Sequence, residues 1–333
     1  MTAPVRLGVI GAGGIAKAYG EILGGAFPVP AVAAGVADVR EDAAQALAAP
    51  LGAPTFATAE ALLEARAGEL DAVVLCTPPN THPALAATFA AAGVHVLCEK
   101  PLAVDRATAE AMVTTAAGHR TLLGMATKFR FCDDIRTVAS YMADGRLGAI
   151  RLVENAFTSR VDMSNRWNAD ASISGGGVLV DNGTHSVDLL RFLLGPLAEV
   201  LAVETCRPST LAVDDCVRVH VRAESGVDGA IDLAWSIDKS LSDFLHVYGT
   251  EGEARVGWRE SAFRRYGGDW ENIGPGYGKH PAMGSALAQF CRAVQGVEAL
   301  EVGASEGVIA AQTIEATYES IRRGGWVKLA ELG

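Results

Sequence analysis

The segment VRLGVIGAGGIA (residues 5–16) decides the fold of the N-terminal half of this chain. A short apolar, strand-like run leads directly into Gly11, Gly13 and Ala16, which form the pattern G-x-G-x-x-A. The first glycine permits a tight turn, the second lets backbone approach a pyrophosphate, and the small third residue lets a helix pack closely on the sheet. The segment predicts a dinucleotide-binding loop, with a merely structural glycine turn as the alternative. The loop residues expected to contact the cofactor are Gly11, Gly13, Gly14 and Ile15.

The alternation of strand-like and helical patterns continues to about residue 125. Further apolar runs occur at residues 31–38, 71–77, 94–100 and 121–126, with helical patterns between them. Strands that are apolar on both faces are typical of a parallel sheet covered by helices. Residues 1–125 are therefore predicted to form a doubly wound, NAD(P)-binding Rossmann domain.

The pattern changes beyond residue 148. Strand-like runs such as IRLVENAF, CVRVHVRA and GAIDLAWSI follow one another with short turns between them, and helical patterns return only near the C-terminus. This pattern is typical of an antiparallel sheet with one packed face and one more open face. We therefore predict an α/β protein in which residues 126–333 form an α+β domain for substrate binding and oligomerisation, built on a large, mostly antiparallel open sheet.

The composition argues against several classes of protein. The 39 acidic residues outnumber the 28 basic ones, for a formal net charge of −11, and this does not suit a nucleic-acid surface. The N-terminus does not resemble a signal peptide, and no apolar run reaches the ~18 residues of a membrane span. The six cysteines and the scattered histidines show no metal-ligand spacing. We expect a cytoplasmic protein with reduced thiols and no metal.

The second predicted strand ends at Asp38. A carboxylate at this position accepts hydrogen bonds from the adenosine ribose and repels a 2′-phosphate, so it favours NAD over NADP. Arg40, two positions later, could accommodate that phosphate. The sequence therefore predicts NAD as the cofactor and leaves NADP as the alternative.

Polar residues follow the predicted strands at the carboxyl edge of the parallel sheet, where ligands bind in doubly wound folds. Lys100 lies in CEKP after the fourth strand, and TPPNTH follows the third. A solvated lysine and an ordinary turn are the structural alternatives. Farther along, SGGGVLVDNGTHSVDLL (residues 174–190) places Asp181 and His185 four residues apart, on one face of a predicted helix. A helix-capping acid and a core histidine are the alternatives for this pair.

The segments GVIGAGGIA, CTPPNTH, CEKP, KFRF and SGGGVLVDNGTHSVDLL occur in an order that resembles the Gfo/Idh/MocA oxidoreductases, which include inositol dehydrogenases and glucose–fructose oxidoreductase. The resemblance covers essentially the whole chain. It implies that Lys100, Asp181 and His185 surround the reacting carbinol beside the nicotinamide. The residues after the strands that it assigns to the cofactor site are Thr77, Pro78, Asn80, His82, Glu99 and Lys100.

The resemblance implies an NAD(P)-dependent oxidoreductase that acts on a secondary alcohol or ketone of a sugar, cyclitol or sugar derivative. An imidazole titrates near neutrality, so His185 is expected to remove the hydroxyl proton. Lys100 would hold the same oxygen and stabilise a developing alkoxide, while Asp181 would orient the ligand. Gly183 costs about 1 kcal/mol of helix propensity, a cost that a close approach of backbone to cofactor or substrate would explain.

The chain departs from the family pattern at Lys128, where many relatives carry a polar uncharged residue. A second lysine near the nicotinamide would indicate an acidic or acylated substrate, and a lysine that pairs with a carboxylate is the alternative. Tyr277 and His280 are weak candidates for the site. The polar segment 159–170 supplies stronger candidates for substrate binding, with ordinary loop residues as the alternative: Arg160, Asn165, Arg166 and Trp167.

Two other functions are compatible with these motifs. One is an enzyme that keeps its cofactor bound while it couples oxidation to reduction or to another bond cleavage, and the other is a non-catalytic dinucleotide-binding regulator. The alternating row VRVHVRA on an open sheet also needs a partner on its outer face. We therefore expect a homodimer or homotetramer.

Overall fold

The quoted N-terminal segment forms a strand, a tight turn and a helix. In the computed structural model, which describes residues 3–205 and 211–332, β1 (Val5–Ile10) is followed by α1 (Gly14–Glu21). Gly11 between them has a φ of 90°, and a Cβ on this residue would lie 3.0 Å from the backbone of Cys76. Only glycine suits this position, because the left-handed conformation and the close approach both exclude a side chain.

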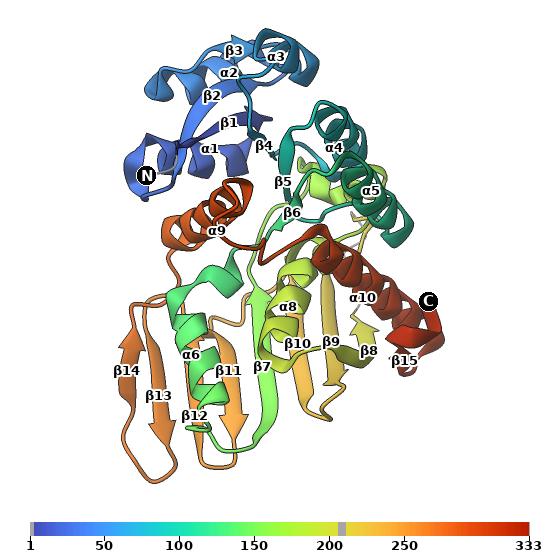
Figure 1. Ribbon diagram of the computed structural model, residues 1–333. Coiled ribbons are helices and arrows are strands. Elements are labelled where there is room, and N and C mark those ends of the chain that lie inside the picture. Colours follow the sequence, from blue (N-terminus) through green and yellow to red (C-terminus); the bar gives the residue numbers. More distant parts are fainter. Residues whose placement is uncertain (1–2, 206–210, 333) are drawn as a thin grey trace. The chain divides into compact units, whose positions relative to one another are not determined.

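The first sheet is parallel throughout its described pairs and has the strand order β3-β2-β1-β4-β5-β6. Strand order reverses between β1 and β4, and this is the place where doubly wound sheets bind ligands. Figure 1 shows these strands with helices against them. The remaining strands of this sheet are β2 (Ala31–Ala37), β3 (Thr55–Phe56), β4 (Ala72–Leu75), β5 (His95–Glu99) and β6 (Leu123–Ala126).

The helices between these strands start at side-chain caps in two cases. Thr58 accepts the N–H of Ala61 at the start of α3, and Asp105 accepts the N–H of Thr108 at the start of α5. Each cap satisfies one of the N–H groups that a helix leaves unbonded in its first turn. The helical segments here are α2 (Glu41–Ala48), α3 (Ala59–Ala65), α4 (His82–Ala91), α5 (Arg106–His119), the π-helical η1 (Ile22–Ala26) and the 3₁₀ segments η2 (Ala49–Leu51) and η3 (Pro79–Thr81).

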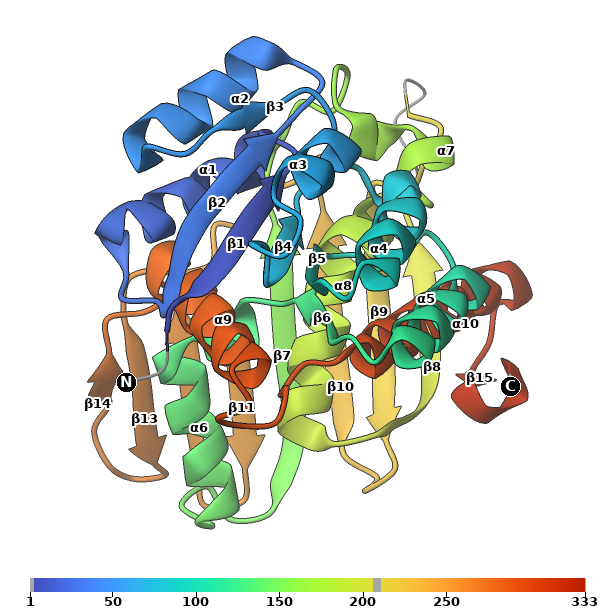
Figure 2. The ribbon, with the colours of Figure 1, turned by 45° about the horizontal axis from the view of Figure 1, so that its top comes forward.

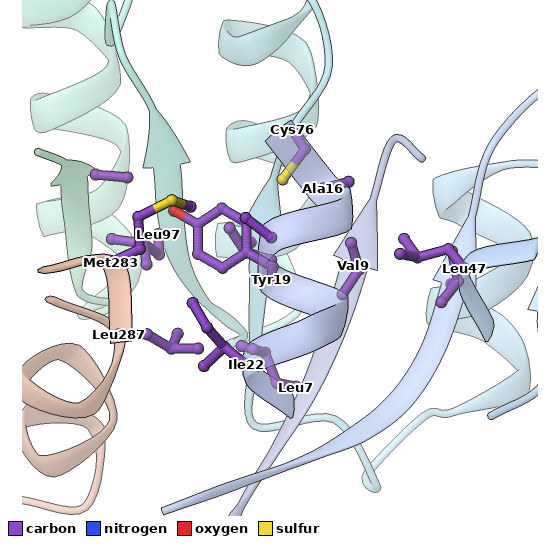
Figure 3. Packing of buried hydrophobic residues seen from close by; sticks show 14 of the residues in the cluster. Leu7, Val9, Ala16, Tyr19, Ile22, Leu47, Cys76, Leu97, Met283 and Leu287 are labelled. Atoms are coloured by element: carbon purple, nitrogen blue, oxygen red, sulfur yellow. The ribbon is translucent and has the colours of Figure 1, made fainter. Parts of the chain in front are cut away.

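A helix from late in the chain completes the core of this first unit. The chain divides into one unit of Met1–Lys128 with Lys279–Val308 and a second of Phe129–Gly278 with Ile309–Gly333. The predicted division at residues 125 and 126 instead gave everything after residue 125 to one domain. The difference arises from α9 (Lys279–Val294), whose Leu287 and Phe290 are buried in one cluster with Tyr19 and Ile22. In Figure 3, Leu287 lies beside Ile22 of this cluster.

The second unit is built on a mostly antiparallel sheet, as the strand-rich pattern of the sequence predicts. Its strand order is β14-β13-β12-β11-β7-β10-β9-β8-β15, and among its described pairs only β7 with β10 is parallel. The strands are β7 (Ile150–Thr158), β8 (Leu197–Glu204), β9 (Cys216–Ala223), β10 (Asp228–Ala234), β11 (Asp243–Gly249), β12 (Gly252–Gly257), β13 (Ser261–Arg265), β14 (Glu271–Gly274) and β15 (Val327–Lys328).

One face of the second sheet is covered by helices. α8 contacts β7, β9 and β10, and α6 contacts β12 and β14; Figure 2 shows both helices on the same face. Along β9, Val217 and Val219 are buried toward these helices while Arg218 and His220 are exposed. The helical segments of this unit are α6 (Asp133–Ala143), α7 (Ala171–Ser174), α8 (Val178–Leu194), η4 (Phe129–Phe131), η5 (Trp167–Ala169) and η6 (Leu329–Leu332), and α10 (Ala304–Arg323) belongs to it from Ile309 onward.

None of the helices in the described ranges combines the length and the apolar character that crossing a membrane requires. The cysteines at 76, 98, 132, 216 and 291 are free thiols. Cys206 lies outside the described residues.

The contribution of α9 to the first core can be tested by substitution. Phe290→Ala should lower the free energy of unfolding by about 3–5 kcal/mol, because it removes a fully buried ring and leaves a cavity. The measurement is urea unfolding followed by far-UV circular dichroism. As the control, Val297→Ala, at a position that is 58% exposed, should change stability by less than about 0.5 kcal/mol. Equal stabilities for the two variants would contradict this packing.

Candidate functional site

The turn between β1 and α1 leaves space in front of the helix. Gly13 is the N-cap of α1 and has no side chain with which to bond the first N–H groups. A Cβ on Gly13 or Gly14 would meet nothing within 4 Å. Unsatisfied N–H groups and the positive end of the helix dipole therefore face open space at this turn. This geometry fits the pyrophosphate of a dinucleotide.

Asp38 is anchored to the same turn. Its Oδ2 accepts the Ala12 N–H at 2.6 Å, and its Oδ1 accepts the Arg40 N–H at 2.8 Å. Each carboxylate oxygen has a second lone pair, so Asp38 keeps capacity to accept ribose hydroxyls. The exposed Arg40 side chain has its Nε 3.6 Å from Asp38 Oδ1. The carboxylate, held at the end of β2, is the dominant charge beside the loop.

The end of β5 carries a buried carboxyl group beside Lys100. Glu99 Oε1 accepts the hydroxyl of Tyr19 at 2.9 Å, and Oε2 accepts the Lys100 N–H at 3.2 Å. Burial raises the pKa of Glu99, while the positive charges of Lys100 and Lys128 and the bond from Tyr19 oppose that rise. The partly buried Lys128 thus acts on a carboxyl group, which favours the second of the two interpretations that its sequence position allows.

His82 connects two loops of the first unit. Its Nε2 lies 2.9 Å from the Thr77 carbonyl oxygen, and its Nδ1 lies 3.1 Å from that of Pro101. Burial lowers the pKa of His82, so the ring is neutral near pH 7 and donates one of these bonds. The ring nitrogens face the protein's own backbone. His82 therefore positions the loops after β4 and β5, which differs from the direct cofactor contact expected of it.

The other residues of TPPNTH lie on the loop and the short 3₁₀ turn after β4. Thr77 Oγ1 accepts the hydroxyl of Thr81 at 2.7 Å, and Thr77 and Pro78 are half-buried. Asn80 is exposed. The carboxyl end of β4 therefore presents a small polar surface next to those of β1 and β5.

In the second unit, Asp181 and His185 lie one turn apart at the start of α8, as their spacing predicts. Asp181 is half-buried and His185 is 7% exposed. The ring of Phe129 packs edge-on against the imidazole, with 5.1 Å between centroids. This contact restricts the orientation of the ring that is the candidate acid and base.

The structure gives a different reason for a glycine at position 183 from the one that the sequence suggested. A Cβ at this position would come within 3.2–3.3 Å of Leu179, Leu233 and Ile314. These are apolar side chains of α8, β10 and α10. The glycine lets α8 pack closely within the core of the second unit, so its cost in helix propensity is explained by packing rather than by an approach to cofactor or substrate.

The KFRF segment is fixed to α8 by a buried ion pair. Arg130 Nε donates to Asp188 Oδ2 at 3.1 Å and its terminal nitrogen bonds Asp188 Oδ1, with side chains that are 7% and 2% exposed. The guanidinium also lies 5.5 Å from the centre of the Phe192 ring. This pair anchors the segment that carries Phe129 to the helix that carries His185.

Tyr277 belongs to the aromatic group beside His185. Its ring stacks on Phe129 with 4.8 Å between centroids. Its loop is fixed by the Gly276 N–H, which donates to Asp134 Oδ2 at 2.7 Å. Tyr277, a weak candidate from sequence, is therefore one ring away from the imidazole. His280, the other weak candidate, forms an ion pair with Glu21 in the first unit instead.

The substrate candidates on segment 159–170 share an exposed loop. Trp167 is 41% exposed, and the loop is organised locally by Asp162, which accepts the N–H and the hydroxyl of Ser164. All four candidates, Arg160, Asn165, Arg166 and Trp167, lie on this exposed loop.

Within residues 3–205 and 211–332, no group of three or more His, Cys, Asp or Glu side chains could hold a metal ion.

Two side chains that support these sites were not predicted from the sequence. Tyr19 bonds Glu99 from α1, and Asp214 bonds the start of α8. The available signals were a tyrosine within a predicted helix and a pair of acids, at 214 and 215, between the apolar residues Val213 and Cys216. Neither signal shows which group the side chain bonds.

Comparisons with known proteins agree with this architecture. Residues 5–127 match the family described as "Oxidoreductase family, NAD-binding Rossmann fold", and residues 135–255 match the "GFO/IDH/MocA C-terminal domain". Inositol 2-dehydrogenase of Rhizobium meliloti (strain 1021) is 32% identical over 74% of this chain and 74% of its own length. The rhizopine catabolism protein MocA of Rhizobium meliloti is 28% identical over 96% of this chain and 95% of its own length.

A solved structure of levoglucosan dehydrogenase in complex with NADH and levoglucosan has a TM-score of 0.89 to this chain. It is 22% identical and covers 98% of this chain and 99% of its own. At this identity the likeness shows the fold alone.

The buried carboxyl of Glu99 predicts a pH dependence of stability. Because the pKa of Glu99 is raised above 4.5, its contribution to stability is fully present below pH 4.5 and is lost as the pH rises through the higher value. Glutamine does not ionise. The stability of Glu99→Gln relative to wild type should therefore increase from about pH 4 to about pH 8, by roughly 1.4 kcal/mol per unit of raised pKa.

Urea unfolding of the cofactor-free protein at several pH values measures this difference. Tyr19→Phe is the companion variant, since it removes a bond that lowers the pKa of Glu99. Its stability should fall more steeply than that of wild type as the pH rises. A Glu99→Gln difference that is constant with pH would refute the shifted pKa.

Proposed function

The chain belongs to the Gfo/Idh/MocA oxidoreductase family, and from this premise we propose that it transfers a hydride between NAD and a secondary alcohol or ketone of a sugar, cyclitol or sugar derivative. The family makes it an NAD(P)-dependent oxidoreductase with an NAD-binding Rossmann domain. The observation that carries the proposal is the pair of Asp181 and buried His185 on one face of α8. An acid and an imidazole in this arrangement suit proton removal from a hydroxyl group.

His185 is proposed as the acid and base of the reaction. Bound nicotinamide would supply the hydride chemistry, and the imidazole would take the hydroxyl proton during oxidation and return it during reduction. Phe129 on one edge of the ring limits its rotation. Asp181, one turn before it, would accept a hydrogen bond from a neighbouring substrate hydroxyl and stabilise the protonated imidazole.

Lys100 is proposed to hold the substrate oxygen and to stabilise negative charge on it. The lysine follows β5 at the carboxyl edge of the parallel sheet and is half-buried, so its charge is less screened than that of a surface lysine. Glu99, one residue earlier, is fixed by Tyr19 and by the Lys100 N–H. These bonds restrain the backbone from which the ammonium group extends.

The proposed substrate class rests on the relatives together with the polar character of the site. The similar proteins are named inositol 2-dehydrogenase and levoglucosan dehydrogenase, among others. Arg160, Asn165, Arg166 and Trp167 are proposed as substrate contacts from the exposed loop. Lys128 is proposed as a further substrate contact, and its positive charge also opposes the rise in the pKa of Glu99.

NAD is proposed as the cofactor over NADP. Asp38 is held beside the glycine turn by the Ala12 N–H, where its charge would repel a 2′-phosphate. The proposed contacts around the cofactor all lie in the first unit, at the end of β5 or on the segments that directly follow its parallel strands, and are Gly11, Gly13, Gly14, Ile15, Asp38, Arg40, Thr77, Pro78, Asn80, Glu99 and Lys100.

A cytoplasmic homodimer or homotetramer is proposed for the assembled protein. The outward face of β8, β9 and β10 carries cross-strand ion pairs, such as Arg218 with Asp232 and Arg222 with Glu199. Val203 on β8 is 59% exposed and Trp326 is 40% exposed. A second copy would cover these apolar groups. The free thiols of the described cysteines suit a reducing compartment.

Substitution of the proposed catalytic side chains tests the function. Lys100→Met and His185→Ala should each lower kcat by at least about 100-fold, because each removes a group that stabilises or deprotonates the reacting oxygen. Reduction of NAD with a panel of inositols, hexoses, sugar acids and aminosugars measures turnover. NAD affinity, measured by protein fluorescence, should remain nearly unchanged.

His119→Ala and Lys328→Met, at exposed positions, are the matched controls and should retain wild-type kcat. Near-normal turnover in His185→Ala or Lys100→Met would reject the assigned roles. Binding of NAD by the wild-type protein without turnover of any member of the panel would instead indicate a dinucleotide-binding regulator.

Substitution of Asp38 tests the cofactor preference. In Asp38→Ala, the ratio of kcat/KM with NAD to kcat/KM with NADP should fall by about tenfold or more, because a charge-assisted hydrogen bond and a repulsion are lost together. The ratio is the useful quantity, since loss of the bond to the Ala12 N–H affects binding of both cofactors. An unchanged ratio would show that Asp38 does not select the cofactor.

A further inference from the structure

The first N–H groups of α8 are bonded by one residue from a distant loop. Asp214 Oδ2 accepts the Gly177 N–H at 2.9 Å, and Oδ1 accepts the Leu179 N–H at 2.8 Å. The backbone oxygen of Asp214 accepts the N–H of Val178 at 2.9 Å. Three successive donors at the start of α8 are therefore satisfied by Asp214, whose side chain is buried.

The carboxylate of Asp214 is itself held by α10. The hydroxyl of Tyr318 donates to Asp214 Oδ2 at 2.6 Å. Burial and the neighbouring carboxylate of Asp214 raise the pKa of Tyr318, so this hydroxyl keeps its proton throughout the working pH range. Both carboxyl oxygens of Asp214 therefore accept hydrogen bonds, Oδ2 from Gly177 and Tyr318 and Oδ1 from Leu179.

The glycine triplet before α8 makes room for this contact. Gly175 ends α7 with a φ of 82°. A Cβ on Gly176 would lie 2.1 Å from the Tyr318 hydroxyl oxygen, and one on Gly177 would lie 1.9 Å from the Asp214 backbone oxygen. Glycine at 176 and 177 is thus a steric requirement of the bonds that Tyr318 and Asp214 make.

We propose that Asp214 and Tyr318 are positioning residues for the reaction: together they fix the first turn of α8 and, with it, the placement and electrostatic environment of Asp181 and His185. This inference rests on the proposed function. At 1.5 Å of rise per residue, Asp181 lies about 3 Å along the helix axis from Leu179, and His185 about 9 Å. A shift of the anchored turn therefore moves Asp181 and then His185 directly.

The negative charge of Asp214 also lies at the positive end of the α8 dipole. A carboxylate at this end stabilises the helix and offsets the positive potential that the first turn would otherwise impose on its side chains. Asp181 lies in this same turn. Removing the bonds of Asp214 should therefore disturb turnover more than it disturbs binding of the cofactor, since the glycine turn is in the other unit.

The test compares Tyr318→Phe and Asp214→Asn with wild type in steady-state kinetics. Tyr318→Phe removes the single hydroxyl that orients the carboxylate, and kcat should fall about tenfold while KM for NAD stays within twofold. Asp214→Asn retains one acceptor oxygen, and Asp214→Ala retains none. The expected order of kcat is therefore wild type, then Asp214→Asn, then Asp214→Ala, with partial rescue by asparagine.

Thr317→Val is the matched control on the same helix. Thr317 is buried next to Tyr318, but its hydroxyl bonds the Thr313 carbonyl within α10. A general loss of packing in α10 would lower kcat in Thr317→Val as well as in Tyr318→Phe. Hydrogen exchange at residues 177–185 should accelerate in Tyr318→Phe and Asp214→Asn and stay unchanged in Thr317→Val.

The outcomes separate this inference from the proposed function. If His185→Ala is inactive while Tyr318→Phe and Asp214→Asn keep kcat within twofold of wild type, positioning by Asp214 and Tyr318 is wrong and the function stands. Equal losses of kcat in Tyr318→Phe and Thr317→Val would also overturn it. If His185→Ala keeps wild-type turnover, the proposed function fails first, and the inference fails with it.

Discussion

The carboxyl ends of parallel strands lie at one edge of their sheet. This constraint brings the polar residues that follow the strands of the first unit to a common edge. β1, β2, β4 and β5 pair in parallel, so the turns and residues that follow them come to the same edge. Gly11 keeps the first of these turns tight enough to lie against Cys76. The open N-terminus of α1, the carboxylate of Asp38 and the ammonium group of Lys100 are consequences of where their strands end.

In the second unit the candidate catalytic residues depend on how the N-terminus of α8 is held in place. α8 presents Val187 and Leu190 to the core and Asp181 on its partly exposed face, so rotation of the helix is set by burial. Burial alone leaves the position of the first turn undefined. Bonds to neighbouring elements, from Arg130 to Asp188 and from Asp214 to Gly177, define it.

Local patterns in the sequence were sufficient for the fold class and for the place of each motif. These patterns depend on neighbours within a few residues: the alternation of strands and helices, the glycine pattern, and the spacing of Asp181 and His185. The structure contains the elements that these patterns predict. The remaining contacts join residues far apart: Tyr19 and Glu99 are 80 positions apart, and Asp214 and Tyr318 are 104. Periodicity shows that such side chains are buried but not what they bond.

The same limit explains Gly183 and α9. A glycine within a helix signals a close approach, and only the packed structure shows that the approaching groups are Leu233 and Ile314. An amphipathic helix signals a buried face, and only the structure shows that the face of α9 belongs to the first core.

The return of the chain to the first unit has a consequence for biosynthesis. The strands of the parallel sheet leave the ribosome early, yet Phe290 and Leu287, which fill their core, emerge after almost all of the second unit has been made. Until then the nascent N-terminal segment exposes apolar surface around Tyr19 and Ile22. The core of the first unit can therefore be completed only after α9 has left the ribosome.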